Sequence, residues 1–123
     1  MADQYLEDLA RSLFKRRAEG VVIPFEPRAT DLRLEPQDCH ANVDAWCRFH
    51  PGHKACRGWF VIDQPAIRQT LFVSHSVIAD EHGRRFDPTP RRFRNEYPFL
   101  EDDDPLYQLR NYYRNLRSVT HPY

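Results

Sequence analysis

The sequence predicts an α+β fold in which a helix at 39–49 packs on an antiparallel sheet. Helical spacing is the first observation: one face of that segment carries Cys39, Val43, Trp46, Cys47 and His50. The second is the apolar segment 70–79, whose alternating side chains fit a strand. The third is the length of 123 residues, which suits one domain with one core over 1–123.

The N-terminal part is expected to form an amphipathic helix over residues 3–19. Its apolar stripe consists of Leu6, Leu9, Leu13 and Phe14, and Gly20 ends it. Residues 21–23 are a short strand candidate. Residues 24–37 contain three prolines and are expected to be mostly irregular.

The central helix begins with a cysteine. Asp38 is a good N-cap, because its carboxylate can accept from free backbone N–H groups of the first turn. Cys39 then occupies the first helical position, where the helix dipole stabilises a thiolate. A small buried residue also fits there, so a nucleophile and a packing residue both remain open. Residues 51–52, Pro-Gly, stop the helix.

Three strands are expected after this helix. Residues 56–63 form a buried strand that Gln64-Pro65 breaks, and 70–79 form the second. A turn follows at 80–83, with Gly83 free to take a positive φ, and 84–87 return as the third strand.

The C-terminal part is expected to contain an acidic loop at 98–104 and a helix from 105 to about 118. Asp104-Pro105 is an N-cap and N1 pair. The inward stripe of the helix comprises Leu106, Leu109, Tyr113 and Leu116. We interpret the acidic run as a solvated cap for this helix. The alternative is that the run binds a metal.

Composition argues against several classes of protein. Lys+Arg and Asp+Glu are 18 each, so no large nucleic-acid footprint is expected, and the basic clusters at 15–17 and 91–94 read as solvated charge. Three cysteines without a secretory segment or a long apolar run predict no disulfide framework, secretion or membrane span. We expect a reducing, cytoplasmic setting and assign no cofactor.

His75 is the unusual residue of the strand at 70–79. It shares a face with Leu71, Val73, Val77 and Ala79, so its imidazole needs a polar partner. Either it is a core histidine bonded to backbone, or it is a general base in a pocket. If the turn has an odd number of residues, Asp80 pairs with Arg84 and Asp87 comes within reach of His75. A two-residue turn would put Asp87 on the opposite face.

These residues have complementary chemistry. Cys39 would attack, His75 would remove its proton and later protonate the leaving group, and Asp87 would orient the imidazolium. A His75 with an ordinary pKa would make activity rise through roughly pH 6–7.

Residues 75–90, His-Ser-Val-Ile-Ala-Asp-Glu-His-Gly-Arg-Arg-Phe-Asp-Pro-Thr-Pro, resemble the histidine strand and Asp-Pro-Thr turn of transglutaminase-like domains. Those domains belong to the papain-like cysteine fold, and the resemblance covers about 38–90. It implies that Cys39 is the nucleophile, His75 the base and Asp87 the third member. It also implies a peptidase, amidase, deamidase or acyltransferase acting on amide bonds of a protein or peptide substrate.

Two alternatives remain open. Four residues spaced by three could hold zinc, with Cys39 and His40 nearby: Cys47, His50, His53 and Cys56. The other alternative is a catalytically inactive interaction module that keeps the fold. The aromatic residues Trp46, Trp59 and Phe60 fit either a substrate groove or the core.

Overall fold

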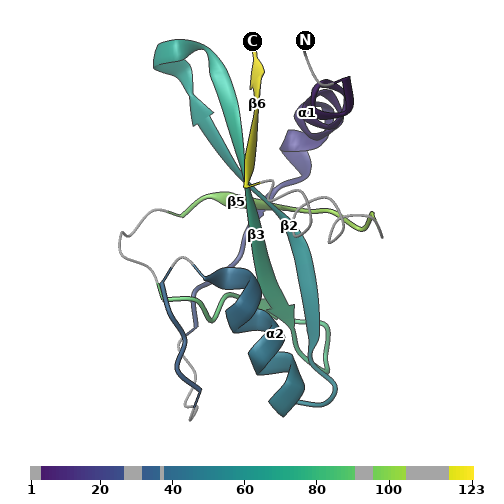
Figure 1. The fold of residues 1–123 in the computed structure, drawn as a ribbon, viewed down its shortest axis with the longest axis vertical. Helices are drawn as coiled ribbons and strands as arrows, with labels where there is room; N and C mark the ends of the chain where they lie inside the picture. Colours follow the sequence, from purple (N-terminus) through teal and green to yellow (C-terminus); the bar gives the residue numbers. More distant parts are fainter. Residues whose placement is uncertain (1–3, 27–31, 37, 91–95, 105–116) are drawn as a thin grey trace.

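A computed structural model describes residues 4–26, 32–36, 38–90, 96–104 and 117–123 (Figure 1). Within these ranges two α-helices accompany a six-stranded sheet with antiparallel pairings, which confirms the α+β class. The helices are α1 (Gln4–Arg16) and α2 (Cys39–Phe49). The strands are β1 (Val21–Val22), β2 (Lys54–Gln64), β3 (Gln69–Ala79), β4 (Arg85–Phe86), β5 (Pro98–Glu101) and β6 (Ser118–Pro122).

The long hairpin of β2 and β3 forms the centre of the sheet. Its ladder runs without a break from Lys54 opposite Ala79 to Gln64 opposite Gln69. Both strands are therefore longer than predicted. The hairpin closes through a 3₁₀ turn, Pro65–Ile67, and Arg68 in the left-handed conformation with φ of 53°.

Both helices pack on the same face of β3, toward opposite ends of the strand. Leu9 and Leu13 of α1 pack with Phe72, and Val43 and Trp46 of α2 pack with Ile78. Phe72 and Ile78 are an even number of residues apart, so they face the same side. Figure 1 shows α2 along one half of the hairpin and α1 beside β6 near the other.

The other face of the sheet carries a separate apolar cluster, consisting of Ile23, Cys56, Val77, Ala79 and Phe99. His75 belongs to this face by parity. The predicted shared face of His75, Val77 and Ala79 thus exists, but α2 does not cover it. The side chain of His75 lies on the face opposite the core of α2.

Several predicted boundaries change. Helix α1 ends at Arg16 and continues as a 3₁₀ turn, Arg17–Glu19. Gly20 follows this turn in an extended conformation, with φ of −61° and ψ of 141°. Strand β1 stops one residue short of the predicted Ile23. Helix α2 has the predicted bounds.

The acidic loop and the C-terminal helix need the largest corrections. Residues 98–101 form β5, not a loop, because Phe99 and Leu100 are buried between β1 and β2. Most of the predicted helix, 105–116, lies outside the described residues. Its predicted end is wrong, since Ser118 begins β6 and pairs with Val73.

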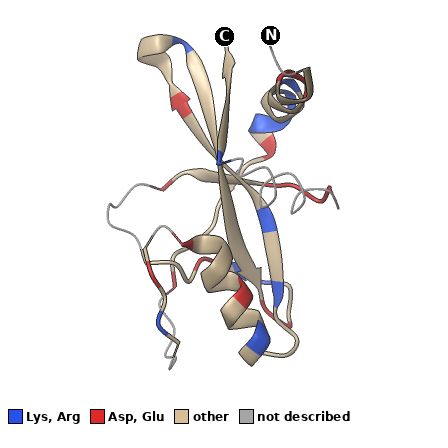
Figure 2. Cartoon of the chain, viewed as in Figure 1, with Lys and Arg blue, Asp and Glu red and all other residues tan. Residues whose placement is uncertain are grey.

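Charge is spread over the elements with both signs interspersed, as Figure 2 shows. Acidic residues follow one another at 101–104, at the end of β5. Among the described residues, no helix is long and apolar enough to cross a membrane.

Candidate active site

The start of α2 is held differently from the prediction. The carboxylate of Asp38 makes no capping hydrogen bond; instead the Asp38 carbonyl accepts from the backbone N–H of Asn42 at 2.9 Å. Cys39 is nevertheless the first helical residue, half-buried and with a free thiol. The expected position of the thiol is therefore kept, without the expected cap.

The turn between β3 and β4 has the odd register on which the site depends. The backbone N–H of Asp80 donates to the carbonyl of Arg84 at 2.9 Å, and Ala79 pairs with Arg85. The Asp80 carboxylate also accepts from the backbone N–H groups of His82 and Arg84. Gly83 takes the positive φ that the turn requires, 80°. The conditional prediction for this hairpin is confirmed.

Asp87 therefore meets His75. Oδ2 of Asp87 lies 2.6 Å from Nε2 of His75, and both side chains are buried. Oδ1 of Asp87 accepts from the backbone N–H of Thr89 at 3.1 Å. The backbone of Asp87 is fixed as well, since its N–H donates to Pro24 and its carbonyl accepts from Glu26. A buried carboxylate is thus paired and held from several sides, as its desolvation demands.

The thiol of Cys39 lies near enough to the His75 ring to raise the pKa of the imidazole. Because Asp87 occupies Nε2, the ring nitrogen that remains for the thiol is Nδ1. Burial lowers the pKa of His75, but the hydrogen bond to Asp87 and the nearby Cys39 thiol outweigh it and raise the pKa to about 9. The expectation of an ordinary pKa is wrong, because His75 lies between two acidic groups. At neutral pH the ring is an imidazolium.

Aromatic rings enclose the imidazole. Phe60, half-buried, stacks on His75 with ring centroids 3.9 Å apart, and Phe99 meets it edge-on at 6.2 Å. Of the three aromatic residues considered for a groove, Trp46 and Trp59 are core, with 2% and 1% of their surface exposed. Only Phe60 lies against the candidate site.

A second polar group beside the site was not predicted. The ring of His40 bonds the hydroxyls of Ser74 and Ser76, and Asn42 donates to the hydroxyl of Thr89 at 3.2 Å. The serines alternate with Phe72 and Ile78 on the α2 side of β3. Hydroxyls that alternate with buried apolar residues require polar partners, and this was the signal available in the sequence.

The alternative zinc site is not formed. Across the described residues, which include all four proposed ligands, no group of three or more His, Cys, Asp or Glu side chains could hold a metal. His50 bonds the Trp46 carbonyl, while His53 accepts from the Trp46 indole and contacts Glu81 at 2.7 Å. The prediction failed because these rings serve packing around Trp46. The acidic run at 101–104 forms no such group either.

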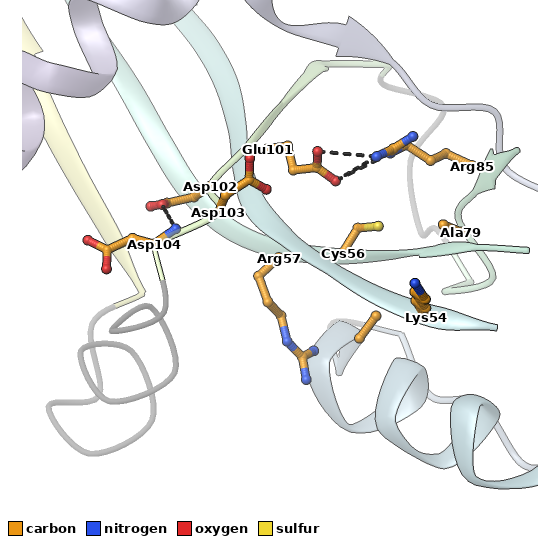
Figure 3. A pocket seen from close by; sticks show the side chains of 10 residues that line it. Lys54, Cys56, Arg57, Ala79, Arg85, Glu101, Asp102, Asp103 and Asp104 are labelled. Atoms are coloured by element: carbon orange, nitrogen blue, oxygen red, sulfur yellow. Dashed lines mark hydrogen bonds and ion pairs between the residues drawn. The ribbon is translucent and has the colours of Figure 1, made fainter. Parts of the chain in front are cut away.

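Cys56 lies in a separate cavity of about 520 Å³ at the edge of β2 (Figure 3). Figure 3 shows Cys56 and Arg57 on opposite sides of the strand, with Arg85 paired to Glu101. Burial and Glu101 raise the pKa of Cys56 to about 11. This thiol stays protonated at neutral pH, which makes it a poor nucleophile.

Comparisons with protein-family models, curated proteins and solved structures find no match for this chain. The transglutaminase-like resemblance therefore remains a prediction carried by the residues and their geometry.

Proposed function

We propose that this protein is a cysteine hydrolase or acyltransferase that acts on amide bonds through Cys39, His75 and Asp87, in the manner of papain-like and transglutaminase-like enzymes. The observation that carries the proposal is the position of His75. Its ring bonds the buried carboxylate after β4 and lies near the thiol at the start of α2, which contributes to the raised pKa of the imidazole. This placement supports the roles of nucleophile, base and orienting acid for the three residues.

The first half-reaction would transfer the acyl group to Cys39. The thiolate attacks the carbonyl carbon of the amide, and a C–S bond forms as the carbonyl oxygen becomes an oxyanion. The imidazolium of His75 gives its proton to the departing nitrogen, the C–N bond breaks, and a thioester remains. Asp87 keeps the ring oriented throughout, because its carboxylate holds Nε2.

The second half-reaction would release the acyl group. His75, now neutral, takes a proton from water or an amine, whose lone pair attacks the thioester carbon. The C–S bond breaks and the thiolate returns beside the imidazolium. Water as acceptor gives proteolysis or deamidation, while an amine gives acyl transfer.

The start of α2 contributes to both half-reactions. The backbone N–H of Cys39 lies at the positive end of the helix dipole, where an oxyanion is stabilised. We assign this N–H as one donor of the oxyanion site, in keeping with the chemistry of acyl transfer.

The test is turnover of defined amides. The purified protein is incubated with a peptide library and with a glutamine-containing peptide, with and without a primary amine, and products are read by mass. We expect turnover that Cys39→Ala abolishes and Cys47→Ala retains, since Cys47 is a half-buried thiol on the same helix. Equal turnover by Cys39→Ala and the parent protein would refute the assignment.

A further inference from the structure

His40 occupies a defined place between the helix start and the histidine strand. Its Nδ1 lies 2.5 Å from the hydroxyl of Ser76, and its Nε2 lies 2.9 Å from the hydroxyl of Ser74. Residue 40 follows Cys39 directly, and the two serines flank His75 on β3. The His40 ring thus links the residue after Cys39 to the two serines that flank His75.

The hydrogen bonds continue from Ser76 into α2. Arg57 donates to the Ser76 hydroxyl at 2.8 Å and contacts Asp44 at 2.5 Å. Arg57 can only donate, so the Ser76 oxygen accepts from it. The Ser76 O–H is then the donor to Nδ1 of His40. Nε2–H of His40 then donates to Ser74, so the hydrogen bonds from Arg57 through Ser76 and His40 to Ser74 run in one direction, while Arg57 also donates to Asp44.

His40 is neutral in this arrangement. Burial, Arg57 and His75 lower the pKa of His40 to about 4. A neutral ring offers one donor and one acceptor, which is what two hydroxyls on either side can satisfy when Ser76 is already bonded to a cation.

The first turn of α2 needs an anchor of this kind. The Asp38 side chain does not cap the helix, and β3 pairs with β4 at 78–79 and with β6 at 69–73, on either side of His75. Helix ends that lack side-chain caps are prone to fray. A loose first turn would move the thiol away from the imidazole.

We propose that His40 is a positioning residue, whose ring anchors the first turn of α2 to Ser74 and Ser76 and so keeps the thiol of Cys39 against His75. The proposal rests on the proposed function, because it concerns the same Cys39–His75 pair. It predicts that the reactivity of Cys39 depends on a residue that does not touch the substrate.

The test is the rate of Cys39 alkylation by iodoacetamide between pH 5 and 10, followed by peptide mapping. In His40→Leu, and separately in Ser74→Ala/Ser76→Ala, we expect about a tenfold loss of rate at neutral pH. The pH profile of the alkylation rate should move toward that of His75→Ala, in which the imidazole is absent. His40→Gln keeps a donor and an acceptor and should retain most of the parent rate. His50→Gln, at the C-cap of α2 and so at the end opposite Cys39, is the matched control and should keep the parent rate.

The outcomes separate this inference from the proposed function. If parent Cys39 already reacts as an ordinary thiol and ignores His75→Ala, the proposed function fails. If the parent reaction depends on His75 but both folded variants, His40→Leu and the double serine variant, keep the parent profile, only the positioning role fails. A His40→Gln variant as slow as His40→Leu would also overturn the role, since polarity would then be irrelevant.

Discussion

The carboxylate of Asp87 lies 2.6 Å from the imidazole of His75, although the two residues stand on opposite sides of a sharp turn. The turn at 80–84 determines this contact, because its odd register places Asp87 on the same face as His75. In this buried pair the raised pKa of His75 keeps a proton on the imidazole at neutral pH.

Asp87→Asn should lower the pKa of His75. An amide removes the negative charge that raises this pKa, while burial continues to lower it. Titration of the His75 ring signals by NMR measures the effect directly. Asp103→Asn, an exposed acidic position, is the control. A His75 pKa unchanged in Asp87→Asn would contradict the paired geometry.

Turnover should fall as pH rises through about 9. The raised pKa of His75 means that the imidazolium is present below that pH and lost above it. Its loss removes the proton needed by the leaving nitrogen, so the alkaline limb of kcat/KM should report this group. A profile that instead keeps rising to pH 10 would show that His75 does not act as the acid. The rise through pH 6–7 expected from an ordinary histidine is no longer predicted.

Trp46→Ala should destabilise the fold by roughly 3–5 kcal/mol. Trp46 is buried against Phe86 and donates its indole N–H to His53, so truncation leaves both a cavity and an unpaired acceptor. Phe49→Ala is the matched control, because Phe49 is an aromatic residue of the same helix with 67% of its surface exposed. Denaturant melts compare the two variants. Similar losses would contradict the core position of Trp46.

Gly58→Ala should disturb both the sheet and the site. A Cβ at this position would lie 2.2 Å from the carbonyl of Leu100 and 2.6 Å from the ring of Phe99. Gly58 stands opposite His75, whose ring Phe99 meets edge-on. We expect a loss of about 1–3 kcal/mol and slower alkylation of Cys39.

Gly83→Ala is the comparison for Gly58→Ala. Its Cβ would meet nothing within 4 Å, so only its positive φ is penalised. It should lose some stability without slowing alkylation in the folded protein. Gly58→Ala that melts and alkylates like the parent would contradict the close approach of β5.

The sequence was most informative where local rules decide the structure. Helix α2 was predicted at 39–49 because an apolar face and the Pro51-Gly52 stop define it. The pairing of Asp80 with Arg84 followed from one assumption about turn length, and from it the contact of His75 with Asp87.

Long-range contacts decide the remainder. Strand β5 has only two buried apolar residues, and it becomes a strand by lying between β1 and β2. The pKa of His75 depends on what surrounds its ring, which spacing alone did not reveal. The role of His40 required knowing that α2 crosses above Ser74 and Ser76.

Covalent trapping tests the Cys39–His75–Asp87 site most directly. The protein is treated at neutral pH with limiting electrophilic probe, and intact mass and peptide mapping locate the adduct. All three cysteines are free, but burial raises the pKa of Cys47, and that of Cys56 is about 11. We predict one adduct, on Cys39, formed faster than with free cysteine and greatly slowed by His75→Ala. An adduct on Cys47 or Cys56 in place of Cys39, a Cys39 no faster than free cysteine, or labelling of Cys39 undiminished by His75→Ala would contradict the site.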